Sequence, residues 1–232
     1  MEEEIKLIQE AMKTTKKGLE LTEKFGSFLS KICGEGFQNL GSAFSDWTIA
    51  FRYINSIIIY EKLEKIYDKR KIKGKITPIP PRYAISLLNA ASIETDENIQ
   101  DKWAGLIANS TDPGKKFQIQ KIFINILKSL EPLDALILDY LSQYKDIIEA
   151  EDERKSAINA NKIAIDLKKD REEINISLSN LFRIGCILDS WNANRDNIGI
   201  GYQGFRVNNP ESNFCLSDLG RSLMNACKSD FS

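Results

Sequence analysis

The chain has 232 residues, of which 42% are hydrophobic and 28% charged, and its formal net charge is -1. Such a chain is long enough for one large or two small domains with their own hydrophobic cores, and its balanced charge excludes a globally basic nucleic-acid-binding protein. It contains no His, which removes the most common general base and most zinc and iron ligand sets.

The N-terminus and the cysteines favour a cytoplasmic protein. Residues 1–4 are acidic where a secretory signal would be basic, and the most apolar stretch, 47–60, is too short to span a membrane. The four cysteines, Cys33, Cys186, Cys215 and Cys227, contain no C-x-x-C pair. We therefore expect free, buried thiols in a reducing compartment.

Amphipathic helices dominate residues 1–77. Apolar side chains three and four residues apart predict helical structure over 3–33, and a long helix from Ser45 or Asp46 to about Lys71. The prolines between Thr77 and Pro81 disfavour helix and predict an extended linker. We place the first domain boundary here.

A central helical bundle is predicted over 78–145. Helical spacing indicates helices over 82–92, from Thr95 or Asp96 to Asn109, over 116–129, and from Pro132 onward. The connections between them are short and carry turn residues, as in helical bundles.

The last domain, 146–232, is predicted to be winged-helix-like. A helix over 159–167, a turn at 168–170 and a helix over 171–184 that ends at Gly185 have helix-turn-helix spacing. Short strands are expected within 186–191, 205–207 and 214–216, before a helix capped by Ser217. The expected fold is therefore mainly α, with N-terminal amphipathic helices, a central helical bundle and a C-terminal winged-helix-like domain with a small β wing.

The helix-turn-helix raises the question of DNA binding. Candidate DNA-contacting residues are Lys168 and Lys169 for phosphates, and Arg171, Asn175, Ser179 and Arg183 for a groove. However, Glu172 and Glu173 in the first turn would meet phosphates first, and residues 132–232 hold 12 basic against 16 acidic residues. We favour packing or protein contacts and keep DNA binding as an alternative.

Carboxylates gather where the 96–109 helix begins, at Glu94, Asp96, Glu97 and Asp101. Oxygen ligands of this kind can hold Mg²⁺ or Ca²⁺, but their spacing fits no EF-hand loop. Acidic residues in a first helical turn are also ordinary caps. We expect no metal, no cofactor, no catalytic residue and no small-molecule substrate.

The N-terminal third combines a basic balance with aromatic residues such as Phe25, Phe28 and Trp47. Such a segment can lie in a membrane interface or assemble with partner helices. Acidic residues such as Glu20 and Glu23 dilute the cationic face that anionic lipids attract. Internal packing or self-association is the preferred interpretation, with a peripheral membrane contact as the alternative.

One motif carries a family resemblance. It runs from Glu94-Thr95-Asp96-Glu97 through Ile99-Gln100 and Trp103-Ala104 to Leu106-Ile107-Ala108-Asn109 and Asp112-Pro113, followed by Leu130-Glu131-Pro132-Leu133-Asp134-Ala135. This pattern resembles the Abi-alpha family of bacterial abortive-infection proteins, best over 78–141. The resemblance implies a role in defence against phage and no particular chemistry. We interpret the marker residues as structural: Glu94, Asp96, Asp101, Trp103, Asn109, Asp112 and Pro113.

We therefore expect a non-enzymatic phage-defence effector that acts through self-association or by binding a host or phage protein. Three alternatives remain open. One is a winged-helix DNA-binding transcriptional regulator, and another is a membrane-perturbing effector that uses the N-terminal amphipathic region. The third is an enzyme, which would need a carboxylate-metal site that includes Asp96 and Asp101.

Overall fold

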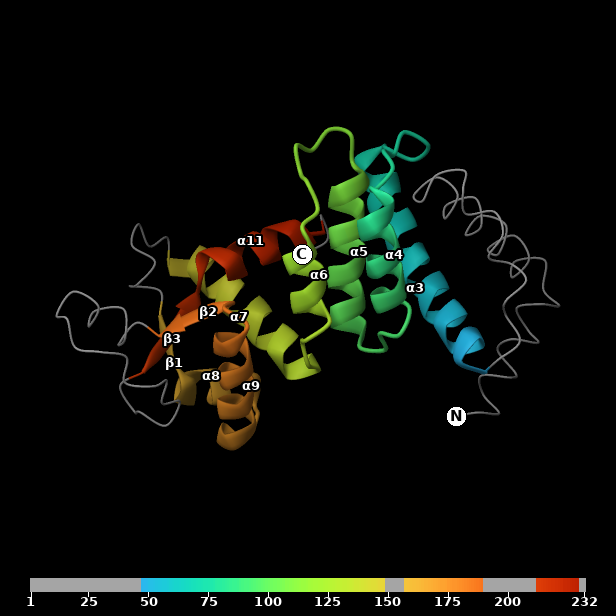
Figure 1. Ribbon diagram of the computed structural model, residues 1–232. Coiled ribbons are helices and arrows are strands. Elements are labelled where there is room, and N and C mark those ends of the chain that lie inside the picture. The colour runs from blue at the N-terminus through green and yellow to red at the C-terminus, as the bar shows by residue number, and fades with distance from the viewer. Residues whose placement is uncertain (1–46, 149–156, 190–211, 230–232) are drawn as a thin grey trace. The chain divides into compact units, whose positions relative to one another are not determined.

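The computed structural model describes residues 47–148, 157–189 and 212–229 (Figure 1). These residues form eight helices and one three-stranded antiparallel sheet, which confirms the mainly α fold class. The chain divides by contacts into two compact units, residues 1–128 with 226–232, and residues 129–225. The helical segment predicted over 3–33, with Phe25 and Phe28, and the strand predicted over 205–207 lie outside the described residues. The domain boundaries after 77 and 145 stay predictions.

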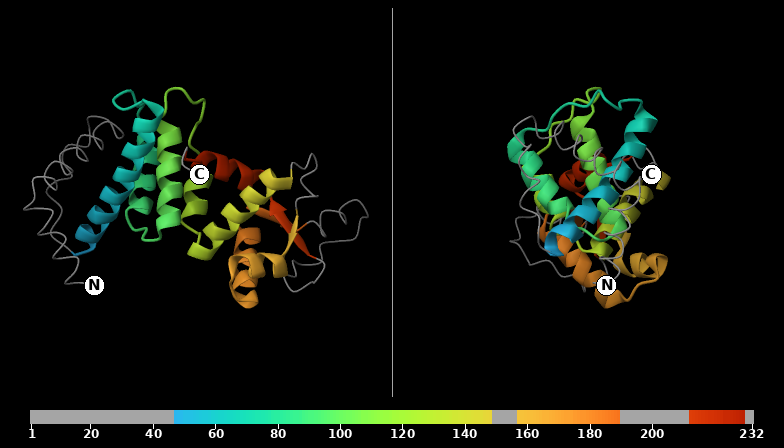
Figure 2. Two further views of the ribbon diagram at one scale, coloured as in Figure 1. Left: turned by 180° about the vertical axis from the view of Figure 1, so that it is seen from behind. Right: turned by 90° about the vertical axis from the view of Figure 1, so that its right-hand side faces the viewer.

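The first unit contains the long helix predicted from Ser45 or Asp46 to about Lys71 and three of the helices predicted for the central bundle. They are α3 (Trp47–Arg70), α4 (Pro81–Ala91), α5 (Glu97–Thr111) and α6 (Lys121–Leu127). Pro81 occupies the first turn of α4, where its missing N–H costs no hydrogen bond. The four helices lie beside one another in Figure 1 and again when seen from behind in Figure 2.

Helix α5 is the centre of this unit. Every residue from Lys102 to Asn109 is buried, so α5 is enclosed on all sides rather than along one stripe. Helix α3 packs along it, and α6 packs on both α4 and α5. The largest fully buried side chains of this unit are Leu63, Tyr67, Ile79, Leu87, Ile99, Trp103, Leu106, Ile107, Ile124 and Leu127.

Helix α6 is shorter than the predicted helix over 116–129, and the prediction of its start was wrong. Residues 116–120 are not helical, and Gln120 has the extended φ of -117° immediately before the helix. Within this stretch Ile119 is buried, and Phe117 stacks on Phe123 with 6.1 Å between ring centroids. The burial of Ile119 and the stacking of Phe117 on Phe123 therefore outweigh the weak helical periodicity of residues 116–120.

The second unit combines helices with the sheet. Its elements are α7 (Pro132–Ile148), β1 (Ile158–Asn159), α8 (Ala160–Leu167), α9 (Arg171–Arg183), β2 (Ile187–Asp189), β3 (Asn213–Leu216) and α11 (Asp218–Cys227), whose last two residues group with the first unit. The strand order is β1-β3-β2, with Ile158 opposite Phe214 and Leu188 opposite Cys215. Sequence periodicity missed β1 because two residues are too few to show an alternation.

This order of elements is compatible with the predicted winged helix, whose wing would fall in residues 190–211, outside the described part. The turn between α8 and α9 is formed as predicted: Lys168 is left-handed at φ 52°, and Asp170 caps α9 by accepting a hydrogen bond from the backbone N–H of Glu172. Ser217 caps α11 through a 2.9 Å hydrogen bond from the Gly220 N–H. Within the described ranges, no helix has both the length and the apolarity that crossing a membrane requires.

Candidate functional site

The first part of the motif builds the start of α5. The Glu94 carboxylate accepts hydrogen bonds from the backbone N–H groups of Thr95 and Asp96, at 2.8 and 2.9 Å. The Asp96 carboxylate in turn accepts from the N–H of Ile99 at 3.0 Å and is the N-cap of α5. The buried Gln100 side chain donates back to the Glu94 carbonyl at 2.9 Å. These groups satisfy donors that a helix start leaves free.

Asp101 connects α5 to α3. Its carboxylate lies 2.5 Å from the Lys62 ammonium of α3, which is also 3.7 Å from the Glu97 carboxylate. The Asp101 side chain is 55% exposed, so this ion pair is screened by water and contributes little to stability. Its effect is to align the two longest helices of the unit.

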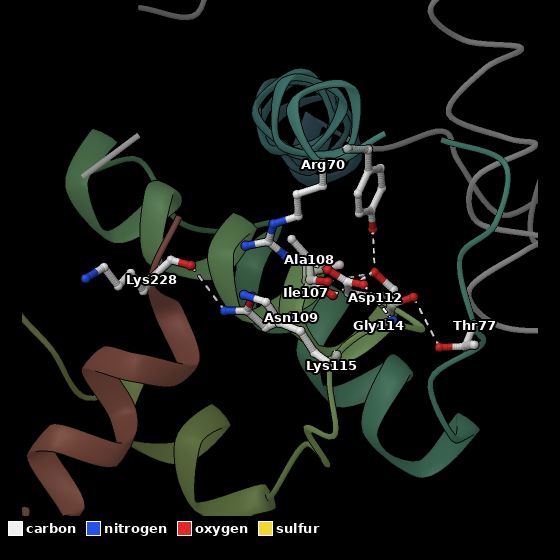
Figure 3. A network of polar contacts seen from close by, with 12 residues as sticks. Arg70, Thr77, Ile107, Ala108, Asn109, Asp112, Gly114, Lys115 and Lys228 are labelled. Carbon is white, nitrogen blue, oxygen red and sulfur yellow. Dashed lines mark hydrogen bonds and ion pairs between the residues drawn. The ribbon is translucent and has the colours of Figure 1, made fainter. Parts of the chain in front are cut away.

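Asn109, near the C-terminal end of α5, contacts residues that are distant in the sequence (Figure 3). Its amide Nδ2 donates to the carbonyl oxygens of Ala226 and Lys228, at 2.7 and 3.2 Å, and its Oδ1 accepts from the Lys115 ammonium at 2.7 Å. The last carbonyls of a helix have no partner within it, so Asn109 caps the end of α11 from outside. This buried amide uses both donors and its acceptor.

Gly105 lies one helical turn before Asn109 and allows the backbone of Cys227 to lie close to α5. A Cβ at this position would lie 1.9 Å from the Cys227 carbonyl oxygen, which is closer than atoms can approach. A side chain here would therefore keep the residues around Cys227 away from α5. The glycine and the asparagine of the motif serve one contact.

Asp112 forms the turn after α5. Its Oδ1 accepts from the Gly114 N–H at 2.9 Å, and its Oδ2 lies 3.4 Å from the guanidinium of Arg70 at the end of α3. Both side chains of this ion pair are 8% exposed, in contrast to Lys62 and Asp101. Pro113 is exposed in the turn itself. Removing one partner of such a buried pair would leave an uncompensated charge.

A hydroxyl pair completes the junction between α3 and α5. The Thr111 Oγ1 hydrogen is directed to the Ile107 carbonyl at 2.9 Å, so the Tyr67 hydroxyl is the donor in the 2.7 Å contact with Thr111 Oγ1. Burial raises the pKa of Tyr67 to about 12. Thr77 donates from both its N–H and its hydroxyl to the Thr111 carbonyl (Figure 3).

Trp103 has a different environment, the apolar core. It is 1% exposed, and its indole N–H finds no acceptor among the described residues. The indole therefore contributes mainly apolar burial. Taken with the polar contacts above, the motif residues join α3, α5, the turn after α5 and residues 226–228.

The six candidate DNA-contacting residues lie on or just before α9. The Arg171 guanidinium donates to the side-chain oxygens of Asn161, at 2.7 Å, and Asn175, and burial lowers its pKa. Lys168 and Lys169 are exposed in the turn, next to the acidic side chains of Asp170, Glu172 and Glu173. The N-terminal end of α9 is therefore not a uniformly basic surface.

One stripe of α9 faces solvent. Glu172, Ile176, Ser179 and Arg183 are exposed, whereas Ile174, Ser177, Leu178 and Leu181 are buried. Ile176 is 67% exposed and lies at the centre of this stripe, between Glu172 and Ser179. Ser179 donates to the Asn175 carbonyl at 2.8 Å, and Arg183 donates to the Asn180 side chain at 2.6 Å.

The sequence of the chain matches the model of a known protein family. The family model described as abortive infection alpha matches residues 55–227, which is most of the chain and nearly all of its described part. The chain belongs to the abortive infection alpha family. Curated proteins yield no match, and neither do solved structures. The description of the family points to abortive infection, a bacterial defence against phage, which is the coarse function predicted above.

The second segment of the abortive infection alpha resemblance, 130–135, contains a buried carboxylate that sequence reasoning did not single out. Asp134 is 1% exposed and accepts from Ser177 Oγ at 2.5 Å, Asn180 Nδ2 at 2.6 Å and the Glu131 N–H at 2.9 Å. It reaches back to the residue before α7, as in a capping box, and holds α9 against α7. An Asp three residues after Glu131 was the available signal.

The chemistry open to this abortive infection alpha chain can be read from its reactive groups. In the described ranges, no three His, Cys, Asp or Glu side chains gather as a metal site would require. Among the described residues, Cys186, Cys215 and Cys227 are buried thiols and form no disulfide, while Cys33 lies outside the described residues. Burial raises the pKa of Cys186 to about 12, so its thiol stays protonated and is a poor nucleophile.

Proposed function

We propose that this abortive infection alpha protein is a non-enzymatic phage-defence effector that acts by protein binding through the exposed face of α9. The observation that carries the proposal is Ile176, 67% exposed at the centre of that face. Ile165 on the preceding helix α8 is 74% exposed. Exposed apolar side chains on adjacent helices favour docking against another protein surface.

Local charge supports protein binding over DNA binding. From Lys168 to Glu173 the chain carries three basic and three acidic side chains, so this end of α9 is electrically balanced. DNA binding draws its affinity from basic groups that release counterions from phosphates. Glu172 and Glu173 lower this electrostatic affinity, because they lie at the N-terminal end of α9, the end with which a recognition helix contacts DNA bases.

The polar contacts of the motif also support a non-enzymatic role. Asp101 and Asp112 face cations of α3, and Asn109 makes three side-chain hydrogen bonds within the first unit. A depression lined by Tyr60, Leu88 and Ile107 among others has room for about one water molecule. Asp101, Asn109 and Asp112 are therefore engaged in contacts within the first unit.

The test is protection of bacteria that express the full chain against a panel of phages. We expect Ile176→Ser to abolish protection without lowering the melting temperature, because the side chain removed is mostly exposed. The matched control is Ile85→Ser, which removes a 44% exposed isoleucine from α4 and should leave protection intact.

A second variant separates protein binding from DNA binding. Lys168→Ala with Lys169→Ala removes the candidate phosphate contacts, and we expect it to protect as well as the wild type does. Loss of protection in this variant, together with salt-dependent DNA affinity of the wild type, would overturn the proposal in favour of a DNA-binding regulator.

A further inference from the structure

The exposed stripe of α9 is complementary to itself. Its four residues, Glu172, Ile176, Ser179 and Arg183, follow at spacings of four, three and four, which keeps them on one line of the helix surface. The line has an acid at its N-terminal end, an isoleucine and a serine at its centre, and a base at its C-terminal end. When a second copy of the helix lies antiparallel to the first, the acid of each helix faces the base of the other.

The register of such a pair follows from the spacing. When Glu172 of one copy faces Arg183 of a second copy, Ile176 faces Ser179, and the two-fold axis repeats both contacts. Each isoleucine then meets a small side chain whose hydroxyl already donates within its own helix. Two oppositely charged pairs flank two contacts between Ile176 and Ser179, and in this register residues 171–184 place no like charges opposite each other.

From this complementarity we infer that the partner of α9 is a second copy of this chain, paired antiparallel through Glu172, Ile176, Ser179 and Arg183 about a two-fold axis. This inference rests on the proposed function, because it names the protein that the exposed face binds. A two-fold axis makes the same patch serve both copies, which is the commonest symmetry of soluble oligomers.

The size of the patch sets the expected strength. Helix α9 has 13 residues, a length of about 20 Å, so one helix pair lies at the small end of specific interfaces. We therefore expect a weak dimer that forms in the micromolar range and dissociates on dilution. Two ion pairs at its edges also predict that high salt weakens it.

Charge reversal tests both the partner and the register. Sedimentation velocity of the full chain, over a concentration series, measures the dimer dissociation constant. Glu172→Arg creates two like-charge pairs in the dimer, and so does Arg183→Glu, so we expect each to raise the constant at least about tenfold. The double variant restores opposite charges and should return to within about threefold of the wild type.

The control is Glu61→Arg, the same charge change at an exposed position of α3, and it should leave the constant unchanged. A monomeric wild type over the whole series would overturn the inference. So would a dimer that ignores both single reversals, or a double variant that is as weak as either of them. Circular dichroism of each variant verifies that the helices are retained.

The outcomes also separate this inference from the proposed function. A monomeric protein that loses protection with Ile176→Ser keeps the proposed function and refutes the second copy as partner. A dimer with the expected charge dependence, whose charge variants still protect against phage, supports the inference and refutes the proposed function.

Discussion

Gly105→Ala is a substitution for which helix propensity and tertiary structure predict opposite signs. Ala is favoured over Gly in a helix interior by about 1 kcal/mol, so the change would stabilise α5 in isolation. In the folded protein the new Cβ would lie 1.9 Å from the Cys227 carbonyl oxygen. A backbone carbonyl cannot rotate away as a side chain can, so residues 226–228 would have to move.

The required movement is about 1 Å or more, because contacts below 3.0 Å essentially do not occur. A shift of this size breaks the bonds from Asn109 to the Ala226 and Lys228 carbonyls, which are 2.7 and 3.2 Å long. Two lost hydrogen bonds cost about 1–3 kcal/mol, and overpacking costs about 1–3 kcal/mol more. After the propensity gain, we expect a net loss of about 1–5 kcal/mol.

The assay is thermal unfolding of the full chain by circular dichroism. For a chain of this length each kcal/mol lowers the melting temperature by about 2–4 °C. Asn89→Ala is the control, because it also introduces Ala into a helix but at an exposed position of α4. It should not lower the melting temperature. A Gly105→Ala melting temperature equal to or above the wild-type value would refute the close approach of residue 227 to α5.

Three more predictions follow from buried polar groups. Asp134→Ala leaves Ser177 and Asn180 without their shared acceptor, so urea denaturation should show a loss of about 2–4 kcal/mol, and a loss below about 0.5 kcal/mol would contradict this role. The pKa of Tyr67 is raised from 10.0 to about 12, so its contribution to stability is complete below pH 10 and is lost as the pH rises towards 12. Tyr67→Phe should flatten the fall in stability over that pH range, and an unchanged slope would argue against it. The pKa of Cys186, near 12, predicts that iodoacetamide labels this thiol at pH 8 only after unfolding, whereas labelling of the native protein at the rate of a free thiol would contradict its burial.

Local signals were enough for most elements. Helical periodicity located α3, α4, α8 and α9, because each buries a face that repeats with the helical turn. The spacing of large apolar side chains also located α5, although that helix is buried on all sides. Capping residues placed two of the ends: Asp96 before α5 and Ser217 before α11. The start of α6 was wrong because Ile119 and Phe117 are held by tertiary contacts that local periodicity does not encode.

The contacts of the motif were beyond sequence reasoning. Asn109 was interpreted as a structural residue of the motif with no partner named, yet it bonds to carbonyls 117 and 119 positions away. Arg70 and Asp112 are 42 positions apart, in different predicted domains. A glycine inside a buried helix, Gly105, was the local sign that another backbone comes close.

The bond between Asn109 and Ala226 also sets an order of events during synthesis. The chain passes from the first unit to the second after Lys128 and returns at Ala226. Asn109 of α5 can therefore bond to Ala226 only after residues 129–225 have been synthesised. At about 5–20 residues per second, translation of the intervening segment takes about 5–20 s. All of residues 129–225 are synthesised before Ala226, so the second unit can fold before the contact between Asn109 and Ala226 closes.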